Sequence, residues 1–189
     1  LVPLLVDRLA AFQWPDGGWN CDKNPTASNS SFMETLIPLR ALALHGAVTG
    51  SVAAADSARR AADVFLKRRL FRRQADGSVI NPDFVKLHYP CYWHYDILFG
   101  LKVLTEAGLL QDERCSEALD LLQSKQLAEG RYWRPLPASA TGDPNRRSRS
   151  GCELVEWGPV SKRRSNPWVT ADALAVLRAR NNGAISTGT

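Results

Sequence analysis

One nine-residue pattern occurs three times in this chain, at residues 34–42, 96–104 and 172–180. Each copy begins with an acidic residue, has leucine at its third and sixth positions, and places a basic residue seventh. Self-similarity spaced by tens of residues is the sequence signature of repeat architectures. We therefore expect a fold built from repeated units, with the functional site where those units meet.

A second pattern lies out of phase with the first, at residues 13–19, 73–79 and 126–132. Each copy runs from a polar residue through an acid and a glycine to an apolar or aromatic residue. Glycine beside an acid favours a turn. The chain is thus expected to alternate helical repeats with turns.

The period of the apolar residues predicts six helices, over residues 3–13, 30–46, 54–71, 90–107, 112–126 and 167–181. The third and fifth are amphipathic, whereas the second, fourth and sixth are apolar nearly all round, as is typical of helices buried on every side. This alternation predicts an all-α fold, a ring or solenoid of helical hairpins with buried inner helices and amphipathic outer ones.

The length of 189 residues fits a single domain. Residues 134–165 are rich in proline, serine, glycine and arginine, which predicts a long surface loop inserted before the last inner helix. The chain does not begin with methionine, and we expect it to be part of something longer.

Cysteine spacing and charge limit the surroundings and partners of the chain. Cys21, Cys91, Cys115 and Cys152 form neither a CxxC pair nor a secreted framework, so we expect a reducing, cytoplasmic location. No segment is long enough to span a bilayer. The net charge of +5 comes from arginine and lysine clusters that would attract anionic groups, including a membrane surface, but solvated helix faces explain most of them. No nucleic-acid-binding motif accompanies them, and no nucleic acid partner is expected.

The first turn, with Gln13, Asp16, Gly17 and Trp19, closely resembles the QW-type repeat of the prenyltransferase and squalene oxidase repeat family, which includes the squalene-hopene cyclases. The resemblance implies an α/α toroid, of which this chain would supply part, the remainder being missing or supplied by association. It implies that Gln13 bonds to a helix end and Trp19 packs against the next repeat. It also implies an apolar, isoprenoid-type ligand in a central cavity.

The sequence lacks the catalytic motifs of that family. Terpene cyclases of this type protonate their substrate with Asp-x-Asp-Asp, and the zinc prenyltransferases use Asp-x-Cys, but neither pattern occurs in these residues. Two functions therefore stay open. One is a toroid domain that binds and transforms an isoprenoid, and the other is a non-catalytic repeat scaffold that binds a lipid or protein partner.

The first residues of the three repeats, Glu34, Asp96 and Asp172, are the candidate catalytic acids. If helices begin near Pro90 and Pro167, Asp96 and Asp172 lie past the first turn, where helix capping does not explain them. A buried carboxylate must be paired, hydrogen-bonded or functional. Either these acids form a structural ring with neighbouring inner helices, or they act as general acids in a cavity. Glu34 also fits a capping box with the residue three positions before it.

Residues 88–96 hold the densest set of chemical groups. Cys91 would be the second residue of a helix, where the helix dipole favours a thiolate. With His94 and either Asp172 or Glu34, it could form a three-ligand zinc site, although packing is an equally ordinary role for these residues.

Aromatic residues near the expected starts of the inner helices would suit the lining of an isoprenoid cavity, because aromatic faces stabilise cations. Core packing between repeats is the alternative. The candidate ligand-binding residues are Phe32, His88, Tyr89, Tyr92, Trp93, Tyr95 and Trp168.

Overall fold

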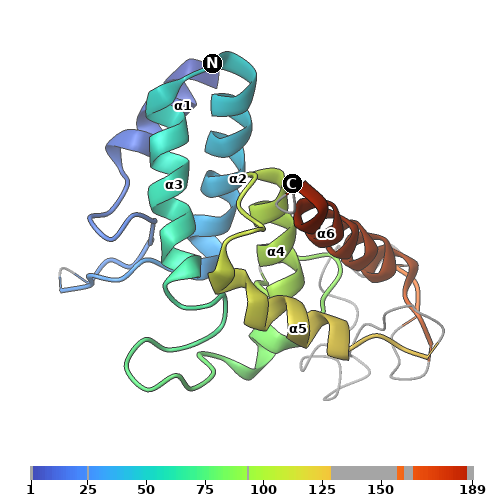
Figure 1. The fold of residues 1–189 in the computed structure, drawn as a ribbon. Coiled ribbons are helices and arrows are strands. Elements are labelled where there is room, and N and C mark those ends of the chain that lie inside the picture. Colours follow the sequence, from blue (N-terminus) through green and yellow to red (C-terminus); the bar gives the residue numbers. More distant parts are fainter. Residues whose placement is uncertain (1, 25, 93, 129–156, 160–163, 187–189) are drawn as a thin grey trace.

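Helices make up the regular structure of the described part of the chain, which is free of β-strands (Figure 1). The computed structural model describes residues 2–24, 26–92, 94–128, 157–159 and 164–186. The α-helices are α1 (Val2–Ala11), α2 (Phe32–Thr49), α3 (Val52–Leu66), α4 (Ile97–Glu106), α5 (Ser116–Ser124) and α6 (Pro167–Ser186), and the 3-10 helices are η1 (Pro82–Val85) and η2 (Glu113–Cys115). The all-α prediction is confirmed.

The helices pack as two rows. In one row, α2 contacts α4 and α4 contacts α6; in the other, α3 packs on α1 and α2, and α5 packs on α4 and α6. The apolar helices are thus neighbours of one another, with the amphipathic helices beside them (Figure 1). This is the alternation that the hydrophobic pattern predicts.

Small residues allow α2 and α3 to pack closely. Gly46 of α2 faces Ala55 of α3 so closely that a Cβ at Gly46 would lie 3.1 Å from the Ala55 amide nitrogen. The buried face of α3 is also rich in alanine and ends in Phe65, whose side chain is fully buried. Burial of this apolar face supplies most of the stability of the helix pair.

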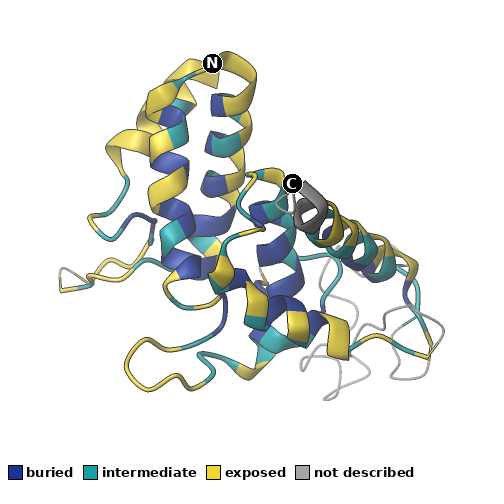
Figure 2. Cartoon of the chain, viewed as in Figure 1, coloured by how far each residue is buried: buried dark blue, intermediate teal, exposed yellow. Residues whose placement is uncertain are grey.

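Among the described helices, α4 alone is apolar and buried on nearly every side, as expected for an inner helix. On α2, by contrast, Met33, Ile37, Leu44 and Val48 are 45%, 52%, 65% and 75% exposed (Figure 2). The prediction of complete burial is wrong for α2 because α2 stands at the end of its row, where its main contacts within the described residues are with α3 and α4. The described part of α6 likewise buries one face, centred on Ala173.

Two helix boundaries differ from those expected. The helix predicted over residues 90–107 begins at Ile97, so residues 88–92 and 94–96 belong to the loop before α4. The helix predicted over residues 54–71 ends at Leu66, because Arg69 and Leu70 adopt left-handed backbone angles, with φ of 44° and 69°.

An aromatic cluster fills the core where α2, α3 and α4 meet. The rings of Phe32, Phe65, Phe84 and Tyr95 lie with centroids 4.7–5.6 Å apart. The Tyr95 hydroxyl donates to the carbonyl oxygen of Leu70 at 2.8 Å. Core packing, the alternative left open by the sequence, is therefore the main role of Phe32 and Tyr95.

The turn at residues 13–19 ties α1 to α3. The Gln13 side-chain amide donates to the carbonyl oxygen of Ser57 at 2.8 Å, and the Trp19 indole donates to that of Leu9 at 3.0 Å. Ser57 lies inside α3, so Gln13 bonds to the side of a helix and not to the helix end that the resemblance implied. The Asp16 carboxylate accepts a hydrogen bond from the backbone amide of Ser30, two residues before α2, at 2.7 Å, which links the turn to α2.

The second predicted turn is also present. Arg72 and Val79 pair as an isolated antiparallel bridge, and Gly77 between them has a φ of 70°. Most of the third turn and nearly all of the predicted loop at residues 134–165 lie outside the described residues, as do Trp93 and Cys152. Among the described helices, none combines the length and apolar character required to cross a bilayer.

The first turn provides a stability test with an internal control. Gly17 has a φ of 104°, and a Cβ there would lie 2.3 Å from the Arg60 carbonyl oxygen. We expect Gly17→Ala to lower the free energy of unfolding by about 2–4 kcal/mol, from left-handed strain and overpacking together. Urea denaturation measures this change.

Gly77→Ala is the matched control. Gly77 also has a positive φ, but no atom lies within 4 Å of the position that a Cβ would occupy there. Gly77→Ala should therefore lower the free energy of unfolding by about 1 kcal/mol, from backbone strain alone. Equal losses in the two variants would contradict the close approach of Gly17 to α3.

Candidate functional site

The residues singled out from the sequence gather around two adjoining pockets near the starts of α2 and α4. The first has a volume of about 170 Å³ and the second about 260 Å³. Cys91, Tyr92 and Phe99 line both. The first pocket is completed by His88, Tyr89, Pro90, Leu98, Lys102 and Asp172, and the second by Met33, Glu34, Leu36, Ile37, His94 and Tyr95.

Asp96 is the fully buried anchor of this region. As the N-cap of α4, its carboxylate accepts a hydrogen bond from the Phe99 amide at 2.8 Å. It also accepts one from the His88 amide at 2.5 Å. The prediction that capping does not explain Asp96 is wrong, because α4 begins one residue after it and not near Pro90. An acidic residue directly before an apolar run was the available sequence signal.

Two further groups approach the Asp96 carboxylate. Cys91 Sγ lies 3.9 Å from Oδ2, and His88 Nδ1 lies 3.3 Å from the same oxygen. The His88 contact lacks hydrogen-bond geometry, so Nδ1 is a buried nitrogen without a hydrogen-bond partner in the described residues. A small rotation of this ring would bring Nδ1 into bonding geometry with Asp96.

Cys91 does not have the thiolate character predicted for it. Burial raises the pKa of its thiol well above the usual range, and the negative charges of Asp96 and Asp172 raise that pKa further. The helix dipole that would have lowered the pKa is absent, because Cys91 lies in the loop before α4. The thiol donates weakly to the His88 carbonyl oxygen at 3.4 Å.

The predicted zinc ligands do not form a metal-binding group. Within the described residues, no three histidine, cysteine, aspartate or glutamate side chains lie close enough together to hold a metal ion. His94 is exposed and its ring stacks on that of His88 at 5.4 Å. Glu34 accepts a bond from the Cys21 amide at 3.2 Å, and no capping box forms because the N-cap side chain of α2 makes no capping bond.

The apolar helices α2, α4 and α6 are linked by the basic residues of the nine-residue pattern. Arg40 of α2 forms a bidentate ion pair with Glu106 of α4, and Lys102 of α4 pairs with Asp172 of α6 at 2.6 Å. Each base thus reaches the next apolar helix. The structural alternative for the acids was a bond to a neighbouring helix, and Asp172 makes such a bond. The sequence did not identify the bases at the seventh position, Arg40 and Lys102, as the residues that form an inter-helix ion pair in two of the repeats.

A second aromatic group borders the first pocket. Tyr89, which lines the pocket, stacks on Trp168 with centroids 5.3 Å apart and meets Trp157 edge-on at 5.4 Å. Tyr92, shared by both pockets, is 55% exposed. Of the predicted ligand-binding aromatics, Tyr89, Tyr92 and Tyr95 line the pockets. Trp168 stacks on Tyr89, and Phe32 is absent from both linings.

The two pockets combine apolar walls with a few charged groups. Met33, Ile37 and Phe99 supply apolar surface in the second pocket, which Glu34 also lines, whereas the Lys102–Asp172 pair lies in the first. Apolar walls with a few converging polar groups are typical of small-molecule sites. The arrangement is suited to holding an apolar molecule and orienting a polar group on it.

Thiol reactivity tests the environment of Cys91. Burial and the raised pKa both protect the Cys91 thiol, so iodoacetamide should modify it at least about tenfold more slowly than Cys21. Glu34 raises the pKa of Cys21 as well, but the Cys21 thiol is exposed. Timed alkylation followed by peptide mass spectrometry measures both sites in one sample. If Cys91 reacts as fast as Cys21 at pH 7, the result would support the predicted thiolate character of Cys91 and contradict its raised pKa.

Replacement of Asp96 tests its anchoring role. Asp96→Ala leaves the amides of His88 and Phe99 without an acceptor, and we expect the free energy of unfolding to fall by about 2–4 kcal/mol. Thermal and urea unfolding report this loss. Asp172→Ala, which removes an ion pair whose two side chains are 32% and 25% exposed, should lower the free energy of unfolding by about 1 kcal/mol. A smaller loss for Asp96→Ala than for this control would contradict the anchoring role.

Comparisons of the chain with protein-family models, with curated proteins and with solved structures found no match.

Proposed function

We propose that the two adjoining pockets bind an apolar, isoprenoid-type molecule, with its hydrocarbon part against Met33, Ile37, Tyr92 and Phe99 and its polar group toward Lys102 and Asp172. The observation that carries this proposal is the convergence of the pocket linings. Residues from α2, α4, α6 and the loop at 88–96 meet there, although they are distant in sequence.

The proposal is for binding and not for acid catalysis by Asp96. Both oxygens of this carboxylate accept backbone hydrogen bonds, and the side chain is fully buried. A general acid must reach the atom that it protonates. Asp172 does line a pocket, but its carboxylate is neutralised by Lys102 at 2.6 Å. These contacts favour a non-catalytic ligand-binding role.

The same proposal includes the architecture. A row of apolar helices beside a row of amphipathic ones is what part of an α/α toroid would contain, and the turn at residues 13–19 resembles the repeat of the squalene-cyclase-type toroids. The first turns of α2, with Met33 and Ile37, would then border the central cavity. A reducing, cytoplasmic location accords with the free thiols of Cys21, Cys91 and Cys115.

Titration with farnesol tests the binding proposal. We expect saturable quenching or enhancement of tryptophan fluorescence, because Trp168 stacks on a pocket residue. Tyr92→Ala removes a ring shared by both pockets and should raise Kd about tenfold, equivalent to about 1.4 kcal/mol. The melting temperature should stay unchanged because the Tyr92 side chain is 55% exposed.

Val48→Ala is the control for nonspecific apolar association. Val48 is 75% exposed on α2 and lies outside both pocket linings. Its replacement should leave the Kd for farnesol unchanged. Lack of saturable binding to the unaltered chain, or equal weakening by the two substitutions, would overturn the proposed function.

A further inference from the structure

A basic turn follows α3 and lies apart from the pockets of the candidate site. It spans Lys67–Arg73 and contains five cationic residues. Two hollows, of about 510 Å³ and 520 Å³, flank it and share Arg73 and Gln74. Lys67, Arg69 and Arg72 complete the cationic lining of the first hollow, and Arg68 that of the second.

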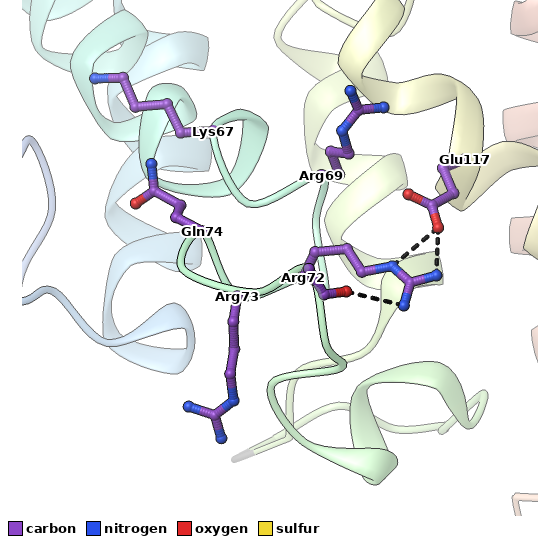
Figure 3. A pocket seen from close by; sticks show the side chains of 7 residues that line it. Lys67, Arg69, Arg72, Arg73, Gln74 and Glu117 are labelled. Atoms are coloured by element: carbon purple, nitrogen blue, oxygen red, sulfur yellow. Dashed lines mark hydrogen bonds and ion pairs between the residues drawn. The ribbon is translucent and has the colours of Figure 1, made fainter.

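The cations of this turn exceed the acids available to neutralise them. In the lining of the first hollow, Glu117 is the acid present, and it pairs with Arg72, whereas Lys67 pairs with Asp63 at 3.5 Å. Arg72 also donates to the Gly77 carbonyl oxygen, so its guanidinium is fixed (Figure 3). The Arg73 side chain donates to the Ile80 carbonyl oxygen at 3.1 Å and interacts through space with Asp76. The first hollow therefore carries an excess of positive charge.

Arg69 is the most informative member of the basic turn. Its side chain is exposed and, within the described residues, has no hydrogen-bond or ion-pair partner. Its φ of 44° is in the left-handed region, which is energetically unfavourable for L side chains and is usually filled by glycine after a helix. Folding alone would thus favour glycine at this position.

Helix capping explains only part of the basic turn. Cations near the C-terminus of α3 complement the helix dipole, which accounts for Lys67 and Arg68. It does not account for Arg73, or for an arginine at the left-handed position 69. The positive charges of Arg69 and Arg73 are therefore placed to bind a negatively charged ligand.

We propose that the basic turn binds a phosphate-bearing anion with at least two negative charges. Figure 3 shows Arg69 and Arg72 on the side of Glu117, Lys67 and Gln74 on the other side, and Arg73 pointing away from both. The cations surround the turn and do not converge on one point. A small anion therefore meets one guanidinium directly, and the other cations of the turn attract it through space. Guanidinium forks suit phosphate oxygens because they donate two parallel hydrogen bonds.

Calorimetric titration of the chain with pyrophosphate at low ionic strength, about 0.01 M, tests this proposal. Arg69→Gly is the decisive variant, because glycine relieves the left-handed strain while it removes the charge. Affinity for pyrophosphate should fall about tenfold and the melting temperature should stay equal or rise. Arg73→Gln, which does not alter a strained residue, should weaken binding in the same direction.

Arg59→Ala is the matched charge control. Arg59 is an exposed arginine of α3 that pairs with Asp56 and lines neither hollow. Its loss should change the affinity by less than about twofold. Weakening by Arg59→Ala equal to that by Arg69→Gly would overturn the proposal, because it would show a response to net charge alone.

Vesicles separate the two sources of such an anion. Sedimentation with vesicles of phosphatidylcholine containing phosphatidylglycerol, compared with phosphatidylcholine alone, reports binding to lipid phosphate. Arg69-dependent binding to pyrophosphate alone assigns the site to a free phosphate compound, and Arg69-dependent binding to anionic vesicles assigns it to a headgroup. Failure to bind either overturns the proposal and leaves the farnesol site unaffected.

Discussion

The buried carboxylate of Asp96 determines the geometry of the candidate site. One oxygen caps α4 through the Phe99 amide, and the other holds the His88 amide. These bonds fix both ends of the loop that carries Cys91, Tyr92 and His94. A carboxylate at an N-cap also gains from the positive end of the helix dipole. The pockets exist where they do because this one side chain connects the loop to the helix.

The residue before this anchor, Tyr95, connects it to the core. Tyr95 packs among the rings of Phe32, Phe65 and Phe84, and its hydroxyl bonds to the backbone of the turn after α3. Gly100, one turn into α4, leaves room for the Tyr95 ring, since a Cβ there would lie 2.5 Å from the hydroxyl oxygen. Tyr95 therefore joins the loop before α4, the aromatic cluster and the basic turn through direct contacts.

The sequence predicted the helical class because the spacing of its apolar residues follows the helical period. It did not predict the start of α4. The aromatic residues among positions 89–95 continue the apolar spacing of a helix toward the N-terminus. The hydrogen bond from the His88 amide to the Asp96 carboxylate, which holds the loop, leaves no recognisable pattern in the sequence. The exposed face of α2 was missed for a related reason, since an apolar helix looks the same in sequence whether neighbours cover one side or all sides.

The gathering of the candidate residues was predicted better than their roles. Glu34, Cys91, Tyr92, His94 and Asp172 do meet around adjoining pockets, as the repeat pattern suggested. Their chemistry depends on burial and on partners that repeats do not encode. Cys91 is protonated because it is buried beside acids, and Asp172 is neutralised by a lysine from the preceding repeat.

Amide hydrogen exchange at His88 is the most direct test of the anchoring interaction. Residue-resolved exchange by nuclear magnetic resonance should show the His88 amide protected as strongly as that of Phe99, because both donate to the same buried carboxylate. Both should exchange only through large-scale unfolding. If His88 instead exchanges as fast as the exposed Gln74, Asp96 does not hold the loop, and our account of how the pockets form is wrong.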